Sequence, residues 1–199
     1  MRSKRLFIAI DIPDSLARTL RDLDPNLLGV RWLPPEQVHL TLSFLGDVPE
    51  DAEARLRENL NAIRFSAFFL PLVGIGAFPG KGRPNVIWIG LGQGHPHLFQ
   101  LHKRVQDAAL AAGLEPDLRP WHPHITLARC RDVSRESISP FLKTNVDLDA
   151  GMFRVQSFAL YSSELNPEGS IHTRELTIPC SGGLCPSNPI VFDAGRAPL

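Results

Sequence analysis

Cysteine is scarce in this sequence, and the few cysteines are poorly placed for disulfides. The 199 residues include Cys130, Cys180 and Cys185, with no Cys-x-x-Cys spacing. An odd number of cysteines without a regular pattern is not the framework of a small secreted protein. The count therefore argues against a disulfide scaffold and predicts a reducing, cytoplasmic compartment.

Long apolar runs are also absent. The basic opening of the chain leads into the apolar run Leu6–Ile10, which stops at Asp11. A secretory signal needs roughly 7–15 apolar residues, and a membrane span needs about 20. The run is too short for either role, so it predicts a first β-strand and a protein without a membrane partner.

Neither sign of charge is in excess, because Lys and Arg together number 21, as do Asp and Glu. Binding of a long nucleic acid relies on a broad positive surface. A neutral chain instead favours local recognition of a small or terminal phosphate. The hydrophobic fraction of 43% is sufficient for the core of one domain or of two small lobes.

Apolar spacing predicts alternating strands and helices over residues 1–180, taken as a single domain. The clearest helix covers 95–112, where Leu98, Leu101 and Val105 share one face and Gly113 follows as a cap. Further helices are expected from Asp14, from Pro49 and over 134–142, and strands over 6–12, 38–45, 65–72, 75–78, 86–91, 122–129, 146–148, 153–162 and 172–178. Residues 181–199 are rich in Gly, Pro and Ser without a period, which predicts a flexible tail.

A weak internal repeat divides the predicted domain. Arg31-Trp32, a proline and His39-Leu-Thr-Leu precede a turn and a helix; Arg119-Pro-Trp121, a proline and His124-Ile-Thr-Leu precede the same series. His124 follows His39 by 85 residues, which is close to half of the domain. A repeat of this length predicts two similar α+β lobes that face each other across a cleft.

Each repeat contains a His-x-Thr motif in a predicted strand. Side chains alternate between the two faces of a strand, so His39 and Thr41 share one face, as do His124 and Thr126. If the lobes are related by symmetry, two imidazoles and two hydroxyls converge in the cleft. Arg129, at the end of the second strand, is the natural cation for a phosphate there.

This set of groups suits phosphodiester chemistry. Displacement at phosphorus needs a base that takes a proton from the nucleophile and an acid that protonates the leaving oxygen. Imidazole serves in either role near neutral pH, and threonine hydroxyls donate to the non-bridging oxygens. Residue types alone do not say which histidine is the acid.

Two other interpretations of the motifs stay open at this point. His39, His122 and His124 together have the composition of a three-imidazole zinc site, although no acidic residue flanks either motif. A non-catalytic protein that binds RNA ends or cyclic nucleotides is the second alternative. The remaining histidines near the predicted long helix, at positions 95, 97 and 102, have no motif partner and are expected to face solvent.

The residues around both motifs resemble the signatures of the two-histidine (2H) phosphoesterases. The matching stretches are residues 32–46, Trp-Leu-Pro-Pro-Glu-Gln-Val-His-Leu-Thr-Leu-Ser-Phe-Leu-Gly, and 122–129, His-Pro-His-Ile-Thr-Leu-Ala-Arg. The chain is most similar to the RNA 2′,3′-cyclic phosphodiesterases, also called 2′-5′ RNA ligases. Residues 5–10 resemble the opening strand of that branch, and residues 78–90 resemble its middle element.

The resemblance implies an α+β fold of two pseudo-symmetric antiparallel sheets with flanking helices and a central cleft. It implies hydrolysis of a 2′,3′-cyclic phosphate, on RNA ends or small cyclic nucleotides, to a 2′-phosphate without metal or cofactor. His39 corresponds to the proton donor and His124 to the proton acceptor, and the reverse reaction would be 2′-5′ ligation. Thr41, Thr126 and Arg129 would bind substrate, and Phe7 would stack on a base. We expect a monomer.

One stretch departs from the family pattern. Near the C-terminus the family tends to have Gly followed by an aromatic residue, whereas here residues 168–173 read Glu-Gly-Ser-Ile-His-Thr. His172 therefore stands where Tyr is expected. The departure leaves the catalytic motifs intact and puts the contact with the base in doubt.

Overall fold

Strands dominate the structure, and every ladder between them is antiparallel. The computed structural model describes residues 3–115, 117, 119–166, 169–181 and 191–192. The elements are β1 (Ser3–Asp11), α1 (Asp14–Arg21), β2 (Val30–Trp32), η1 (Pro35–Gln37), β3 (His39–Pro49), α2 (Glu50–Ala62), β4 (Phe68–Phe78), β5 (Val86–Gly90), α3 (Pro96–Ala111), β6 (Ile125–Cys130), α4 (Arg135–Thr144), β7 (Asp149–Val155), β8 (Ser157–Asn166), β9 (Gly169–Pro179) and β10 (Val191–Phe192).

The strand order shows two halves around a central seam. The sheet runs β10-β7-β4-β5-β6-β3-β1-β8-β9, with β2 added on β6. We call β3, β1, β8 and β9 the first lobe, and β6, β5, β4 and β7 the second lobe. They meet where β3 pairs with β6 at one position, Leu40 with Ile125. The predicted bilobal antiparallel α+β fold is confirmed, with the two sheets joined at this seam.

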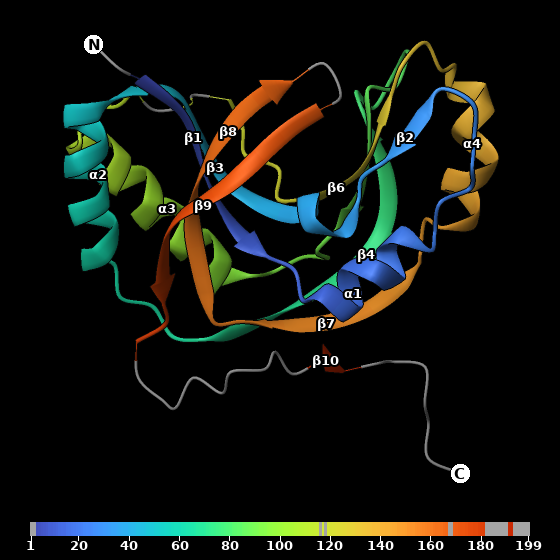
Figure 1. Ribbon diagram of the computed structural model, residues 1–199. Helices are drawn as coiled ribbons and strands as arrows, with labels where there is room; N and C mark the ends of the chain where they lie inside the picture. Colours follow the sequence, from blue (N-terminus) through green and yellow to red (C-terminus); the bar gives the residue numbers. More distant parts are fainter. Residues whose placement is uncertain (1–2, 116, 118, 167–168, 182–190, 193–199) are drawn as a thin grey trace.

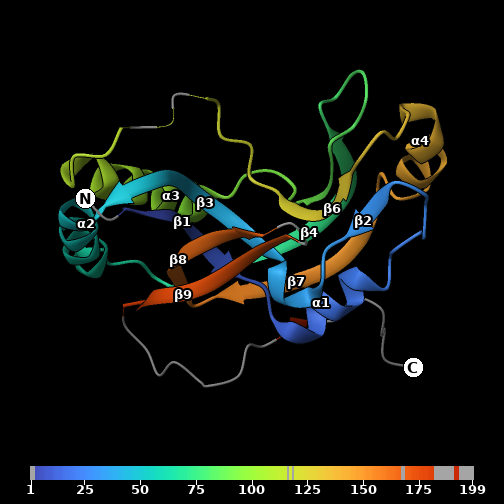
Figure 2. The ribbon, with the colours of Figure 1, turned by 45° about the horizontal axis from the view of Figure 1, so that its top comes forward.

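The helices cover the two lobes in pairs, at opposite ends of a strongly curled sheet (Figures 1 and 2). Helices α2 and α3 pack together beside β3, whereas α1 packs near β7 and α4 near β4. Helix α3 lies between β5 and β6 in sequence, yet it packs on the first lobe. Each lobe is therefore covered by helices from both halves of the chain.

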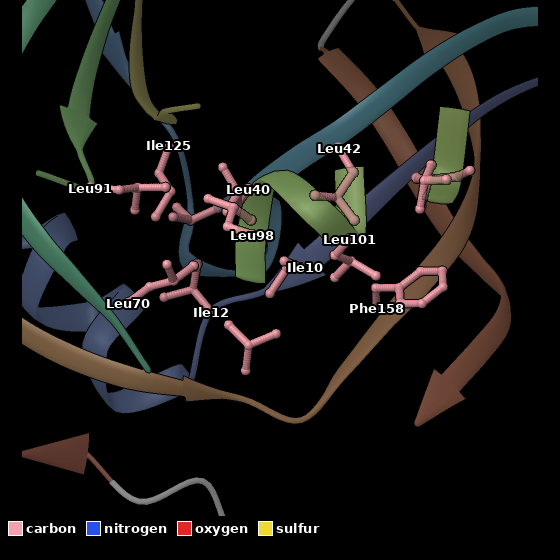
Figure 3. Packing of buried hydrophobic residues seen from close by; sticks show 14 of the residues in the cluster. Ile10, Ile12, Leu40, Leu42, Leu70, Leu91, Leu98, Leu101, Ile125 and Phe158 are labelled. Atoms are coloured by element: carbon pink, nitrogen blue, oxygen red, sulfur yellow. The ribbon is translucent and has the colours of Figure 1, made fainter. Parts of the chain in front are cut away.

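Apolar residues from both lobes form one continuous core. Leu40 and Ile125 are fully buried, and Figure 3 shows them in the same cluster as Leu98 of α3. Truncation of such a leucine to alanine costs about 2–5 kcal/mol of stability. Since one face of the seam is core, alternation sends the neighbouring motif residues to the opposite, polar face.

Several predicted boundaries differ from those observed. The strands expected over 65–72 and 75–78 form one strand, β4, and the strand expected from residue 122 begins only at Ile125. The short strand β2 forms at Val30–Trp32, where no strand was expected. Of the tail predicted over 181–199, the structure describes residue 181 and β10, which pairs with β7. The rest of that prediction lies outside the described residues.

The part of the chain that the structure describes contains no helix that is both long enough and apolar enough to cross a membrane.

Candidate active site

The seam brings the two His-x-Thr motifs side by side. Antiparallel pairing of Leu40 with Ile125 sets His39 toward Thr126, and Thr41 toward His124. Leu40 and Ile125 point into the core, so the four motif side chains share the polar face. The charges of Arg129 and His124 help to lower the pKa of His39, so both residues lie within electrostatic range of the first motif.

A β-bulge follows each motif and returns a later residue to the polar face. Opposite β1, Ala9 pairs with Thr41 and Ile8 with Ser43, so Leu42 is the extra residue. Opposite β5, Trp88 pairs with Thr126 and Ile87 with Ala128, so Leu127 is the extra residue. A bulge shifts the alternation by one position. With strict alternation, the fifth residue after each histidine would point into the core. These residues are Phe44 and Arg129, and the bulges turn them toward the cleft instead.

His39 is held by contacts around its imidazole. Its ring stacks on Phe7 at a centroid distance of 5.0 Å and meets His172 edge-on at 5.7 Å, and it hydrogen-bonds the backbone of Gln37. The pKa of His39 is lowered to about 4, mainly by burial and also by the charges of His172, Arg129 and His124, while the hydrogen bond to Gln37 opposes the shift. In the free protein, therefore, His39 is neutral at pH 7.

His124 is held in a similar way on the other side of the seam. Its Nδ1 lies 2.6 Å from the carbonyl oxygen of His122, and its ring meets Phe78 edge-on at 5.0 Å. An Nδ1–H that donates to this carbonyl leaves Nε2 as the nitrogen available for chemistry. Burial lowers the pKa of His124; the hydrogen bond to His122 opposes this effect and the charge of His122 adds to it. Each catalytic candidate is thus oriented by the backbone two residues before it.

Trp88 and Gly76 form the wall behind His124. The two residues pair across β4 and β5, and the indole lies over the glycine so closely that a Cβ there would stand 2.3 Å from its ring. Only glycine allows this approach without displacement of the indole. The ring of Trp88 in turn lies 6.4 Å from that of His124.

The structure gives Phe7 a different position from the one expected. Phe7 is only 3% exposed, and His39 and Tyr161, from the strands on either side of β1, stack against its ring at 5.0 and 5.2 Å. No ring face is left for a base, so the expected stacking role is corrected to support of His39. Tyr161 is itself fixed, because it donates a hydrogen bond to Asp11 and accepts one of 3.0 Å from Arg174.

His172 lies at the site, although the motifs do not include it. Its ring contacts Phe7 at 4.9 Å as well as His39, and its buried Nδ1 has no hydrogen-bond partner among the described residues. Burial lowers the pKa of His172, and the charge of Arg129 lowers it further. The end of the cleft next to His39 is therefore rich in potential cations.

His102 also differs from its expected place. It was expected to face solvent, but its ring stacks on Trp121 at 3.8 Å and nearly parallel. Burial lowers the pKa of His102. Trp121 also donates from Nε1 to the carbonyl oxygen of Thr41 at 3.3 Å. These contacts tie α3 to the edge of the first motif.

The described residues offer no ligand set for the zinc alternative. Among the described residues, no three His, Cys, Asp or Glu side chains are grouped so as to hold a metal ion. His122 is exposed, and its carbonyl oxygen rather than its ring is what contacts His124. The site has the composition of an acid–base site with a cation beside it.

Comparison with known proteins agrees with this arrangement. The sequence matches the family described as LigT like Phosphoesterase twice, over residues 6–88 and over residues 89–172. This chain belongs to that family. The two matches divide it as the internal repeat does, with one His-x-Thr motif in each.

Relatives of this LigT-like phosphoesterase include two archaeal proteins named RNA 2′,3′-cyclic phosphodiesterase. The protein from Aeropyrum pernix is 33% identical over 79% of this chain and 90% of its own length. The protein from Archaeoglobus fulgidus is 32% identical over 84% of this chain and 96% of its own length. Among solved structures, LigT of E. coli in its apo form has a TM-score of 0.75 at 26% identity, and covers 92% of this chain and 100% of its own. Another structure of that protein contains 3′-AMP.

The sequence motifs assigned no role to two residues near the site of this phosphoesterase, His172 and Phe44. His172 was noted as a departure from the family pattern, without a role. Phe44 was not singled out, because strict alternation puts it on the core side of β3. The available signal was the repeat itself, in which Phe44 and Arg129 occupy the same place after each motif.

Proposed function

We propose that the protein hydrolyses the 2′,3′-cyclic phosphate at an RNA end, or on a small cyclic nucleotide, to a 2′-phosphomonoester. The observation that carries this proposal is the pair of imidazoles on one polar face of the seam, each oriented through its own backbone hydrogen bond. Two oriented imidazoles on a common space supply the base and the acid that in-line displacement requires. The names of the relatives support the choice of substrate.

The proposed reaction uses each polar group once. His124 Nε2 takes a proton from water as the water oxygen bonds to phosphorus, and the bond from phosphorus to O3′ breaks. His39 protonates O3′, which leaves a 3′-hydroxyl and a 2′-phosphate. Thr41 and Thr126 donate to the non-bridging oxygens, and Arg129 offsets their growing negative charge.

Protonation of His39 depends on the substrate in this scheme. A histidine with a pKa of about 4 is almost wholly neutral at pH 7. An anionic phosphate between the two imidazoles favours their charged forms and raises both pKa values. The acid is thus formed mainly when substrate is bound. In the reverse direction, the same groups would join a 2′,3′-cyclic end to a 5′-hydroxyl.

The decisive experiment measures turnover of 2′,3′-cyclic AMP by the wild type and by His39→Ala and His124→Ala. Each variant should lose about 10²–10⁴ in kcat, the usual size of a general acid or base effect. His97→Ala, on α3 and outside the site, is the matched control and should keep full activity. Near-complete activity in either motif variant would refute the mechanism, and no turnover by the wild type would favour a non-catalytic binder.

Chelation separates this proposal from the zinc alternative. Activity should survive exhaustive treatment with a chelator, and elemental analysis of the purified protein should find no stoichiometric zinc. His122→Ala should also retain most of its activity, because the backbone carbonyl that orients His124 is unaffected by the substitution. Loss of activity on chelation, restored by added zinc, would instead support a site made of His39, His122 and His124.

A further inference from the structure

A cavity of about 350 Å³ lies outside the candidate active site, where three segments of the chain meet. Residues 64–66, which connect α2 to β4, form one side, and the first half of α3 forms another. Ser181 forms the third side, and its amide donates to the carbonyl oxygen of Phe65 at 2.7 Å. Figure 1 shows the end of β9 beside the connection from α2 to β4. The volume is within the range of small-molecule sites, at its lower end.

Helix α3 separates this cavity from the catalytic cleft. His97 and Arg104 line the cavity, and their spacing of about two turns places them on one side of the helix. Phe99 and His102 lie on roughly the opposite side, where their rings contact Trp121 at 5.5 and 3.8 Å. The buried stripe of α3 lies between the two sides. A ligand in this cavity would therefore not compete with a substrate in the cleft.

The polar side chains that line the cavity are suited to an anion. All of them can donate hydrogen bonds, and among the described residues no carboxylate lines the cavity. Acidic and basic residues are equal in number in the whole chain, so this composition is a local excess of positive charge. The polar lining residues are Arg64, Ser66, His97, Gln100, Arg104 and Ser181.

Two guanidinium groups are held next to each other in this cavity. Arg104 donates from Nη1 to the carbonyl oxygen of Arg64, and Arg64 donates from Nη1 to the carbonyl oxygens of Asn61 and Ile63 at 2.8 and 3.3 Å. Within the described part of the chain, neither arginine forms an ion pair, and their Nε and Nη2 groups make no hydrogen bond. Two like charges with free donors side by side are stabilised by an anion that bridges them.

Aromatic rings line the cavity beside the two arginines. His97 is exposed, and its ring stacks on that of Phe68 at a centroid distance of 6.0 Å and an interplanar angle of 18°. Phe68 in turn packs against Phe65 at 6.5 Å, and both phenylalanines are buried. A ligand that fills the cavity would thus meet charge on one part of its surface and aromatic rings on another.

We propose that this cavity, which we call the arginine pocket, binds a small phosphomonoester. The phosphate would bridge the guanidinium groups of Arg64 and Arg104, and the organic part would lie against the ring of His97. A phosphomonoester carries close to two negative charges at neutral pH, and guanidinium donors match the geometry of its oxygens. The inference goes beyond the proposed function and does not depend on it.

The test follows the imidazole C–H signals of His97 by NMR while phenyl phosphate is added at constant pH. The signals are assigned with His97→Gln, and they report on the arginine pocket even if phenyl phosphate also enters the cleft. We expect a saturable shift in the wild type. The double variant Arg64→Gln/Arg104→Gln should weaken this binding about 10- to 100-fold, the size expected from the loss of hydrogen bonds to a charged group. Arg55→Gln/Lys103→Gln removes the same net charge outside the pocket and should bind as the wild type does.

A second variant leaves both arginines and their backbone contacts in place. Ser66→Asp puts a carboxylate into the exposed lining of the pocket and should abolish the shift, because like charges repel and the carboxylate also pairs with the arginines. Ser66→Asn, of similar size and without charge, should retain binding. Circular dichroism checks the fold of each variant. Turnover of 2′,3′-cyclic AMP by Arg64→Gln/Arg104→Gln should match that of the wild type.

Four results would overturn the proposal. The first is the absence of a saturable shift of His97 in the wild type. The second is equal weakening in the two double variants, which would reveal an effect of overall charge. The third is equal affinity for benzyl alcohol, which has the ring without the phosphate. The fourth is equal affinity for inorganic phosphate, which would show that the organic part makes no contribution. None of these results depends on whether the protein hydrolyses a cyclic phosphate.

Discussion

The two His-x-Thr motifs are alike in the groups that would do chemistry and unlike in what surrounds them. Both have a histidine oriented by the backbone two residues earlier and a threonine on the same face. In both, the residue directly after the threonine is the extra residue of a β-bulge. They differ two residues after the extra leucine of the bulge, where one motif has Phe44 and the other has Arg129. The shared part contains the proposed acid and base, and the differing part makes the two ends of the cleft chemically different.

The two histidines also differ in the charged groups that surround them. His39 lies near His172 and Arg129, whose charges help to lower its pKa to about 4. For His124, burial is the main cause of a lowered pKa, and the nearby charge that adds to it is that of His122. In a fully symmetric site the two imidazoles would be interchangeable. Here the cations on one side make them distinct, and that distinction can be tested.

The largest expected effect concerns which histidine is the acid. A phosphodiester with a 4-nitrophenyl leaving group needs no protonation of the departing oxygen. On this substrate, His39→Ala should recover most of the 10²–10⁴-fold loss that it shows on 2′,3′-cyclic AMP. His124→Ala should stay low on both substrates, because water must still be deprotonated. Steady-state kcat on the two substrates makes the comparison, and rescue of His124→Ala instead would reverse the assignment.

A smaller effect is expected from the cation. Arg129→Gln removes the charge proposed to face the phosphate and leaves a shorter, neutral amide in its place. Hydrogen bonds to charged groups contribute about 1.5–3 kcal/mol, so kcat/KM on 2′,3′-cyclic AMP should fall about 10- to 100-fold. Arg55→Gln on the surface of α2 provides the control. A change below twofold in Arg129→Gln would show that Arg129 is a solvated strand end.

The smallest effect is the pH dependence of anion binding. Sulfate keeps its charge between pH 5 and 8, and a bound anion raises the pKa of His39 from its free value of about 4. Between the free and bound pKa values, binding takes up protons, so affinity falls as pH rises, by at most about tenfold per pH unit for each proton. Calorimetry in buffers of different ionisation enthalpy measures the uptake. Affinity that is constant over this range would contradict the linkage.

The sequence predicted the local pattern of the site better than its tertiary contacts. Alternation placed His39 with Thr41 and His124 with Thr126, because it depends on residues close in sequence, and the repetition of the motif after 85 residues predicted two lobes. The bulges at Leu42 and Leu127 depend on neighbouring strands, so the orientation of Phe44 was not foreseen. The covering of Phe7 by Tyr161 joins residues 154 apart, which no local pattern reveals.

The path of the chain shows how the two halves of the internal repeat are interlinked. After the first motif and α2, the chain crosses to supply β4 to the second lobe; after the second motif, it returns to supply β8 to the first. Each half thus completes the sheet of the other, and a half-length chain would leave open strand edges and an uncovered core. Two identical copies would close those edges by exchange, as in a strand-swapped homodimer. The present molecule has the strand connectivity that two such copies would have if they were joined into one chain.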